Sequence, residues 1–143
     1  MKITQISVFL ENRKGRLYDA CSILGQNGVN IRALNIAETD KFGVLRMVVD
    51  SPDKALSVLK TNGFVATTTE IVAVEVEDRP GGLAEILGVF NNNEINIEYM
   101  YGFVEKRIDK ALLVFRVESP DSAITALTKA GIKIVGKADI QGL

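Results

Sequence analysis

Two short stretches, LENRKGRL (Leu10–Leu17) and VEDRPGGL (Val76–Leu83), match each other 66 residues apart. Glutamate, arginine, glycine and leucine recur in the same register. The match continues to Ile31 and Ile97, and seven of the 22 aligned positions are identical. An internal repeat at about half of the chain length indicates a duplicated domain. The sequence therefore predicts two small domains, which we place at residues 1–69 and 70–143.

A second block repeats further along each half. SPDKALSVLKTNGF (Ser51–Phe64) matches SPDSAITALTKAGI (Ser119–Ile132) at an offset of 68, with six of 14 positions identical. The offset grows by two residues between the blocks, and insertions are tolerated best in loops. We expect the added residues near 104–110, opposite 39–42 in the first half.

Hydrophobic periodicity predicts the same order of elements in each half: strand, helix, strand, strand, helix, strand. The predicted strands are 2–10, 30–38, 44–49, 64–69, 70–77, 95–104, 110–118 and 133–140, and the predicted helices are 17–27, 52–62, 82–92 and 120–130. A βαββαβ order is that of the ferredoxin-like sandwich, in which two helices cover one face of an antiparallel sheet. The predicted fold class is therefore α+β, with two ferredoxin-like domains.

The composition is that of an ordinary globular protein. The 143 residues have a net charge of −1 and 47% hydrophobic residues. No apolar run is long enough to cross a bilayer, and the first residues do not resemble a signal peptide, so we expect a cytoplasmic protein. The single cysteine, Cys21, and the absence of histidine favour neither a disulfide nor a metal site, and we expect no cofactor.

Two other classes of function are weaker interpretations. An enzyme with a serine or cysteine nucleophile needs a general base such as histidine, which the chain lacks, and Cys21 falls on the apolar face of its predicted helix. Some βαββαβ domains bind RNA through aromatic residues on the sheet. Tyr99, Tyr101 and Phe103 alternate along one predicted strand, but acidic Glu98 flanks them where a basic surface is expected.

The repeated turn itself suggests a ligand site. Backbone N–H groups at the start of a helix lack partners and can bind a carboxylate, and glycine permits close approach, although a tight turn needs glycine for folding alone. Beside these turns, Asn12 and Asp78 can accept hydrogen bonds from an ammonium group or cap the helix. Asn30 and Asn96 open the second strand of each half, where asparagine is disfavoured. Each either forms part of the turn before the strand or forms a hydrogen bond with a ligand.

In these stretches the chain resembles the ACT domain, a small regulatory module. LENRKGRLYDACSILGQNGVNI and VEDRPGGLAEILGVFNNNEINI contain a strand, then Asn/Asp-x-x-Gly-x-Leu, a helix, and Asn-Ile at the second strand. The loop motif is similar to that of the serine-sensing module of phosphoglycerate dehydrogenase. The resemblance implies that two ACT domains pair side by side into an eight-stranded antiparallel sheet with helices on one face, and bind amino acids at the seam.

Carried over to this sequence, the resemblance implies two amino-acid sites if the two halves pair with each other. One would use Asn12, Gly15, Arg16 and Leu17 with Asn96, and the other Asp78, Gly81, Gly82 and Leu83 with Asn30. Pro80 stiffens the second turn where the first has Lys14. With the acidic Asp78, this predicts tighter ammonium binding at the second turn. Pairing between chains would exchange the asparagines.

The predicted function is that of a regulatory protein that senses a free amino acid and has no catalytic domain. The predicted partners are the amino acid, a second copy of the chain in a homodimer, and an enzyme of amino-acid metabolism, but neither nucleic acid nor a membrane. Hydrophobic amino acids fit the expected seam somewhat better than charged ones, and serine and histidine stay open. The alternative is a structural or protein-interaction module that regulates a separate metabolic enzyme without binding an amino acid.

Overall fold

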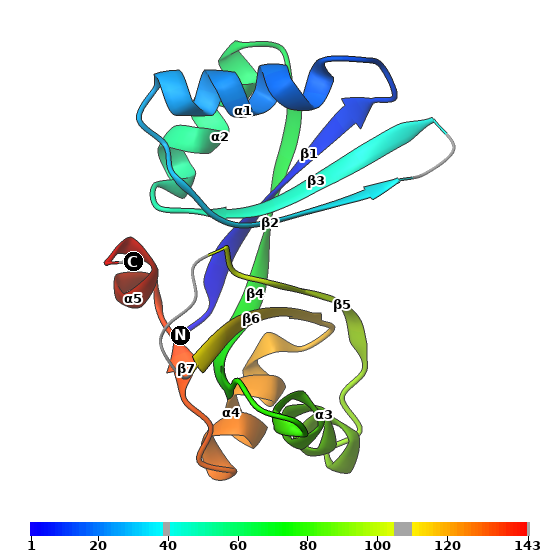
Figure 1. Cartoon of the computed structure of the whole chain (residues 1–143), viewed down its shortest axis with the longest axis vertical. Coiled ribbons are helices and arrows are strands. Elements are labelled where there is room, and N and C mark those ends of the chain that lie inside the picture. The colour runs from blue at the N-terminus through cyan, green and yellow to red at the C-terminus, as the bar shows by residue number, and fades with distance from the viewer. Residues whose placement is uncertain (39–40, 105–109, 143) are drawn as a thin grey trace. The chain divides into compact units, whose positions relative to one another are not determined.

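The computed structural model describes residues 1–38, 41–104 and 110–142, and the chain divides into two compact units (Figure 1). The N-terminal unit is Thr4–Thr69. The C-terminal unit is Glu70–Leu143 together with Met1–Ile3. We keep 1–69 and 70–143 as the proposed limits of the duplicated domains.

The N-terminal unit has the element order βαββαβ. Its elements are β1 (Ile3–Glu11), α1 (Arg16–Gln26), β2 (Ile31–Glu38), β3 (Phe42–Val49), α2 (Pro52–Thr61) and the first residues of β4 (Val65–Glu77). The strands lie in the order β2-β3-β1-β4, and β3 pairs antiparallel with both β1 and β2. Both helices cover the same face of this sheet (Figure 1).

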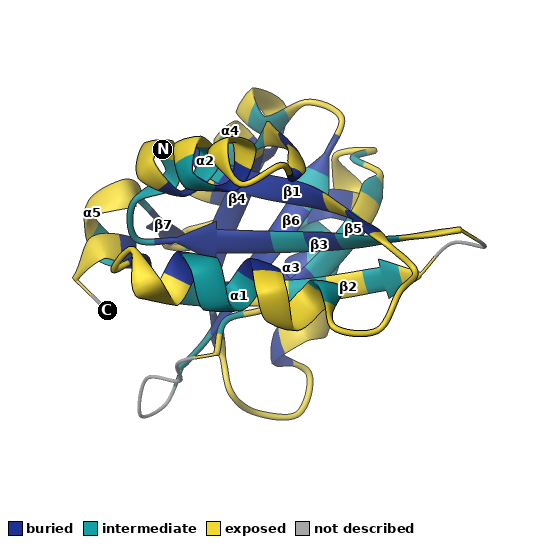
Figure 2. Cartoon of the chain, turned by 90° about the horizontal axis from the view of Figure 1, so that it is seen from above, coloured by how far each residue is buried: buried dark blue, intermediate teal, exposed yellow. Residues whose placement is uncertain are grey.

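The core of the N-terminal unit follows directly from the two periodicities of the sequence. Alternate residues of β1, among them Ile6 and Val8, point to one face of the sheet, where they are fully buried. Helix α1 places Ala20 and Leu24, four residues apart, against the same core. Figure 2 shows this division, with dark-blue buried residues along β1 and β3 and exposed residues on the outer side of α1.

The C-terminal unit repeats the order with one addition. It contains β4 from Glu70 onward, α3 (Gly82–Asn92), β5 (Ile97–Gly102), β6 (Lys110–Val117), α4 (Pro120–Lys129), β7 (Ile134–Val135) and α5 (Lys137–Gln141). The strands lie in the order β5-β6-β4-β7, and the three pairs are antiparallel. The predicted α+β class with two ferredoxin-like βαββαβ units is confirmed.

Two aromatic rings form the centre of the C-terminal core. The ring centroids of Phe90 in α3 and Phe115 in β6 lie 5.1 Å apart, and the ring planes are inclined at 54°. Aromatic pairs favour such a tilted geometry over face-to-face stacking. On β6, Leu112 and Val114 are buried as well as Phe115. Strand β6 therefore buries residues on both of its faces, as its uninterrupted apolar sequence suggests.

The prediction for the last strand is wrong in its second half. We expected a strand over 133–140, but β7 is only Ile134–Val135, and residues 137–141 form the short helix α5. The N–H of Gly136 donates to the carboxylate of Asp139 at 2.9 Å. This local hydrogen bond starts a helix because it satisfies a backbone donor at the helix N-terminus, and it lets Ile140 become buried.

Other differences concern boundaries. Strand β4 is continuous from Val65 to Glu77, where we predicted two strands. Strand β5 is shorter than the predicted 95–104, and the second strands begin at Ile31 and Ile97 rather than at the preceding asparagines. The predicted insertion near 104–110 and its counterpart at 39–42 include residues 105–109 and 39–40, which lie outside the described residues.

Truncation of the central aromatic ring should destabilise the C-terminal unit strongly. Phe90→Ala removes a side chain that is only 1% exposed, and we expect it to lower the free energy of unfolding by about 3–5 kcal/mol in urea denaturation. Val104→Ala is the control, since Val104 is 67% exposed and should change stability by less than about 0.5 kcal/mol. Equal effects of the two changes would contradict the assigned core.

Candidate functional site

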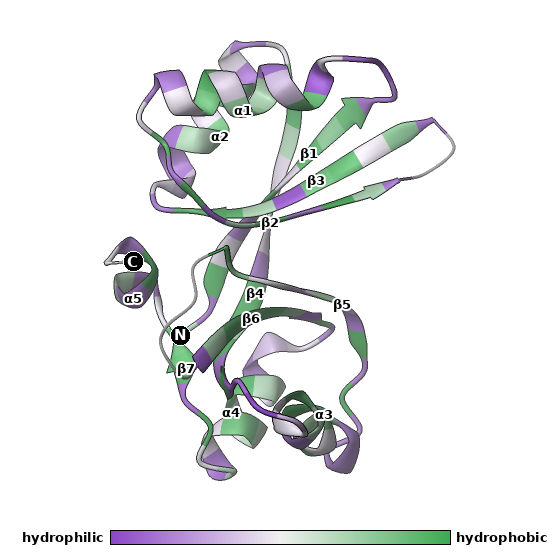
Figure 3. Ribbon diagram, in the orientation of Figure 1, coloured by the Kyte–Doolittle hydropathy of each residue, from purple (hydrophilic) through white to green (hydrophobic). Residues whose placement is uncertain are grey.

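The two β–α turns have the same backbone hydrogen bonds. In the first turn, the N–H of Arg13 donates to the carbonyl of Glu11 at 2.7 Å, and the N–H of Arg16 donates to the carbonyl of Arg13 at 3.3 Å. In the second turn the equivalent bonds are 2.9 and 3.0 Å long. The repeated sequence therefore folds into a repeated backbone, and Figure 3 shows both turns as hydrophilic segments.

A left-handed glycine ends each turn at the position just before the helix. Gly15 has φ 89° and Gly81 has φ 85°, a region that residues with a side chain adopt only with strain. A Cβ atom at either glycine would meet no atom within 4 Å. The backbone conformation, rather than crowding, is therefore what requires glycine here.

Helix capping by Asn12 and Asp78, one of the two roles that we considered, is not observed. The residues at the N-cap positions are Gly15 and Gly81, and neither helix has a side-chain cap hydrogen bond. All five residues Asn12, Asp78, Pro80, Gly15 and Gly81 are exposed in the two turns. Neither Asn12 nor Asp78 therefore occupies the N-cap position of the helix that follows it.

The turns leave several backbone donors available. Within the part of the chain that the structure describes, the N–H groups of Leu17 and Tyr18 at the start of α1 have no hydrogen-bond partner. The same holds for Leu83 and Ala84 at the start of α3. The amides of Arg16 and Gly82 are engaged inside their turns, so the available donors at the helix starts are those of the two residues that follow. These amides, at the positive end of the helix dipole, favour an anion.

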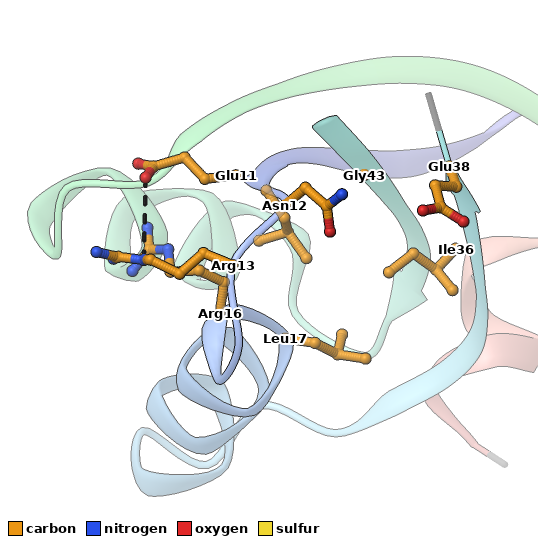
Figure 4. A pocket seen from close by; sticks show the side chains of 9 residues that line it. Glu11, Asn12, Arg13, Arg16, Leu17, Ile36, Glu38 and Gly43 are labelled. Carbon is orange, nitrogen blue, oxygen red and sulfur yellow. Dashed lines mark ion pairs between the residues drawn. The ribbon is translucent and has the colours of Figure 1, made fainter. Parts of the chain in front are cut away.

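The first turn borders a cavity of about 260 Å³. It brings together the predicted residues Asn12, Arg16 and Leu17 with others from three strands; the complete lining is Leu10, Glu11, Asn12, Arg13, Arg16, Leu17, Ile36, Glu38 and Gly43. Figure 4 shows the side chains of Asn12, Leu17, Ile36 and Glu38 around a common space, whereas Glu11 and Arg13 extend to the other side of the turn.

Ile36 and Glu38 are lining residues that our sequence analysis missed. They lie on β2, where Ile36 pairs with Leu45 and Glu38 pairs with Gly43. Leu45 is a core residue on the helix-covered face, so Ile36 must lie on that face too. The alternation of residues along β2 shows that Ile36 and Glu38 share a face, but which face that is depends on the register with β3.

The second turn has shorter ion pairs between its charged side chains than the first turn. Arg79 contacts Glu85 at 2.7 Å and Glu77 at 3.8 Å, and Lys110 contacts Glu77 at 2.6 Å. The hydrogen bond and charge of Lys110 lower the pKa of Glu77, and those of Glu85 raise the pKa of Arg79. In the first turn the corresponding pair of Arg13 with Glu11 is 3.9 Å long.

The two turns also differ at the residue after the left-handed glycine. In the second turn a Cβ atom on Gly82 would lie 2.1 Å from the carbonyl oxygen of Glu77, so no side chain fits there without a backbone shift. The first turn has Arg16 at this place, and its guanidinium carbon lies 4.1 Å from the ring centroid of Phe64. The stacked guanidinium is mostly buried, which favours a cation–π contact.

The predicted asparagines lie at the beginnings of β2 and β5. Asn30 and Asn96 are both exposed. The backbone of Asn30 exchanges two hydrogen bonds with Asp50: its N–H donates to the carboxylate at 3.0 Å, and its carbonyl accepts from the N–H of Asp50 at 3.1 Å. These bonds use the main chain, so they leave the carboxamide of Asn30 for other partners.

Other chemistry has little support among the described residues. No group of three or more His, Cys, Asp or Glu side chains in the described ranges could hold a metal ion. Burial raises the pKa of the Cys21 thiol, which disfavours the reactive thiolate. None of the helices among residues 1–38, 41–104 and 110–142 combines the length and apolar character needed to span a bilayer.

Comparison with known protein families gives a match that covers the whole chain. The family model described as "ACT domain pair" matches residues 1–143. The chain belongs to the ACT domain pair family. The predicted resemblance to a tandem pair of ACT domains is thus confirmed, and the two turns described above are the β1–α1 and β4–α3 turns of the two ACT domains.

Several solved structures resemble this ACT pair. Protein BT0572 from Bacteroides thetaiotaomicron is 36% identical, with a TM-score of 0.93 over 100% of this chain and 98% of that one. The regulatory subunit of aspartate kinase from Thermus thermophilus, in a ligand-free form, is 17% identical with a TM-score of 0.64 over 89% and 91%. The Thermus flavus subunit is 15% identical with a TM-score of 0.60 over 90% and 92%. No curated protein matches the chain significantly.

Alanine at the left-handed glycines should strain both turns. We expect Gly15→Ala and Gly81→Ala each to lower the free energy of unfolding by about 1–2 kcal/mol. The matched controls are Gly25→Ala and Gly88→Ala, because these glycines lie within α1 and α3 with open space around them and alanine should stabilise a helix by about 0.5–1 kcal/mol. Chemical denaturation of the four variants measures this difference, and a loss of similar size at all four positions would contradict the turn geometry.

The contact between Asp50 and Asn30 should make stability depend on pH. Burial opposes ionisation of Asp50, but hydrogen bonds from the Asn30 amide and the Ser51 hydroxyl, with the charge of Arg32, lower its pKa overall. A carboxyl with a lowered pKa stabilises the fold above its unfolded pKa of about 3.9, and this contribution is lost as the pH falls through the folded pKa. In urea denaturation the wild type should therefore lose more stability than Asp50→Asn on acidification, and parallel curves would contradict the prediction.

Proposed function

We propose that this ACT pair is a regulatory protein that binds a free amino acid and has no catalytic activity of its own. The single observation that carries the proposal is the duplicated turn, in which a left-handed glycine precedes a helix with available N–H donors. Such donors suit the α-carboxylate that all free amino acids share. An ACT pair with two such turns offers the same anchor twice.

An ammonium group needs an acceptor close to the carboxylate anchor. Asn12 and Asp78 occupy the same place in the two turns, and Asn30 and Asn96 occupy the same place before the second strands. In the proposed sites the turn of one ACT domain binds the carboxylate, and an asparagine of a paired ACT domain completes the ligand contacts. The proposed residues are Asn12, Gly15, Arg16, Leu17 and Asn30 of the first repeat, and Asp78, Pro80, Gly81, Gly82, Leu83 and Asn96 of the second.

Binding at a seam gives such a protein a way to regulate. A ligand shifts an equilibrium only if it binds two states with different affinities, and an amino acid that contacts two domains favours the state in which they are paired. We propose that the chain acts as a cytoplasmic homodimer whose ligand-bound state alters an enzyme of amino-acid metabolism. The structural similarity to a regulatory subunit of aspartate kinase is compatible with this role through its fold alone.

A structural module that regulates an enzyme without a ligand is the competing function. Several large apolar side chains of the N-terminal unit are more than one-third exposed, among them Phe9, Tyr18 and Phe42, and exposed apolar surface often marks a protein interface. In that case the turns would serve only to fold the domains. The two functions differ in whether any free amino acid stabilises the protein.

A thermal-shift screen against the twenty amino acids separates the two functions. At about 100 times its dissociation constant, a ligand should add about 2.7 kcal/mol of stability, which raises Tm by several degrees for a chain of this size. The shift should be lost in Gly81→Val or Asp78→Ala if the second turn binds the ligand, and in Gly15→Val if the first does. Gly88→Ala, in the same helix as the second turn, is the control.

A shift with one or two amino acids that depends on a turn would support the sensor and identify its ligand. No shift with any amino acid, from protein that unfolds cooperatively, would overturn the sensor and favour the interaction module. Sedimentation of the protein with and without the ligand would then report whether binding changes the oligomeric state.

A further inference from the structure

The cavity beside the first turn is lined by apolar, acidic and basic side chains. Of the basic ones, Arg13 pairs with Glu11 at 3.9 Å. Leu17 and Ile36 are 40% and 52% exposed, and in Figure 4 their side chains lie around the same space as Asn12 and Glu38. Buried Leu10 also lines the cavity. A ligand held there would therefore cover two large apolar side chains that water now contacts, which contributes favourably to binding.

The charges of the cavity favour a cationic group on the ligand. Among the residues that the structure describes, the side-chain carboxylate of Glu38 has no ion-pair or hydrogen-bond partner. Its carboxylate and the carboxamide of Asn12 can both accept hydrogen bonds from an ammonium group. The guanidinium of Arg16 is instead engaged with the ring of Phe64. A second carboxylate on the ligand would meet Glu38 and be repelled, since like charges disfavour each other at short range.

The size of the cavity suits a small ligand. Its volume of about 260 Å³ equals that of eight or nine waters at about 30 Å³ each. Leucine, with nine non-hydrogen atoms, is of similar size. The cavity can thus take the side chain of an aliphatic amino acid.

The second turn does not share this lining. Gly102 of β5 pairs with Leu113, as Ile36 pairs with Leu45 in the first repeat, so glycine takes the place of Ile36. Two residues later, the uncharged Val104 takes the place of Glu38. The apolar wall and the ammonium acceptor of the first turn are both absent from these equivalent positions, which are described residues.

We infer that the cavity at the first turn selects a neutral amino acid with an aliphatic side chain, which Leu17 and Ile36 contact while Glu38 binds its ammonium group. The second turn does not have this selectivity. The inference rests on the proposed function, since it names the ligand class for one of the proposed sites. Its support is the cavity lining and the register of β2, independently of the backbone donors of the turn. It also reverses the expectation that the second turn is the stronger ammonium site.

Titration calorimetry on the full chain tests the selectivity, with leucine, alanine and aspartate as ligands. We expect leucine to bind at least about tenfold more tightly than alanine, because each methylene in an apolar pocket is worth about 10-fold or more, and aspartate not to bind detectably. Ile36→Ala should weaken leucine about tenfold and alanine less than about threefold. Glu38→Gln should weaken both ligands by a similar factor, because both carry the ammonium group.

Two variants outside the cavity serve as controls. Val65→Ala shortens an apolar side chain that is 64% exposed on a strand of the same unit, and Val104→Ala changes the position equivalent to Glu38. Neither should alter leucine affinity. Equal loss of leucine affinity in Ile36→Ala and Val65→Ala, or tighter binding of aspartate than of leucine, would overturn the inference while the sensor function stands. Failure of every amino acid to bind would overturn both.

Discussion

The left-handed glycine before each first helix is the constraint on which the rest of each unit depends. At φ 89° in Gly15 and 85° in Gly81, the chain reverses within five residues of the end of a strand and begins a helix. That reversal sets the helix on one face of the sheet, so that alternate strand residues and one helix face share a core. It also leaves the first free N–H groups of the helix exposed beside the strand end. The fold and the candidate site are therefore consequences of the same backbone conformation.

The two repeats have diverged around this shared turn. Gly82 fits against the carbonyl of Glu77 so closely that a Cβ atom would lie 2.1 Å away, and the ion pairs of Arg79 hold the turn from outside. In the first repeat Arg16 takes the place of Gly82 and stacks on Phe64. Duplication thus preserved the element that folds each domain, while the side chains that would select a ligand changed. A protein with two such sites need not bind the same ligand twice with the same affinity.

Most of the fold was predictable because the repeat shows the same pattern of apolar residues and turns in two parts of the sequence. The αL position of Gly15 and the core face of β1 follow from residues that recur at the same spacing. The last element was not predictable in this way, because residues 133–140 lack a close match in the first half. There, a local hydrogen bond from the N–H of Gly136 to the carboxylate of Asp139 favours a helix. Continuity of β4 was missed because a repeat suggests a boundary even where no residue interrupts the strand.

The site was predictable only in part, for a related reason. The turn residues Asn12, Arg16 and Leu17 belong to one short motif, and all three line the cavity. Ile36 and Glu38 come to the same cavity from β2, and their place depends on the register with β3, which alternation alone does not determine. Residues brought together by strand pairing are thus the ones that sequence reasoning misses, and here they are the ones that bear on ligand choice.

The most direct test of the central claim is a ¹⁵N–¹H NMR titration of the full chain with the amino acid that stabilises it most. If the turns bind the α-carboxylate, the amide signals of Leu17 and Tyr18, or those of Leu83 and Ala84, should shift saturably and further than signals elsewhere in α1 and α3, because a hydrogen bond to an anion changes the environment of the donor. Saturable binding that leaves all four of these amide signals unchanged would contradict the account, since the ligand would then bind away from the two β–α turns.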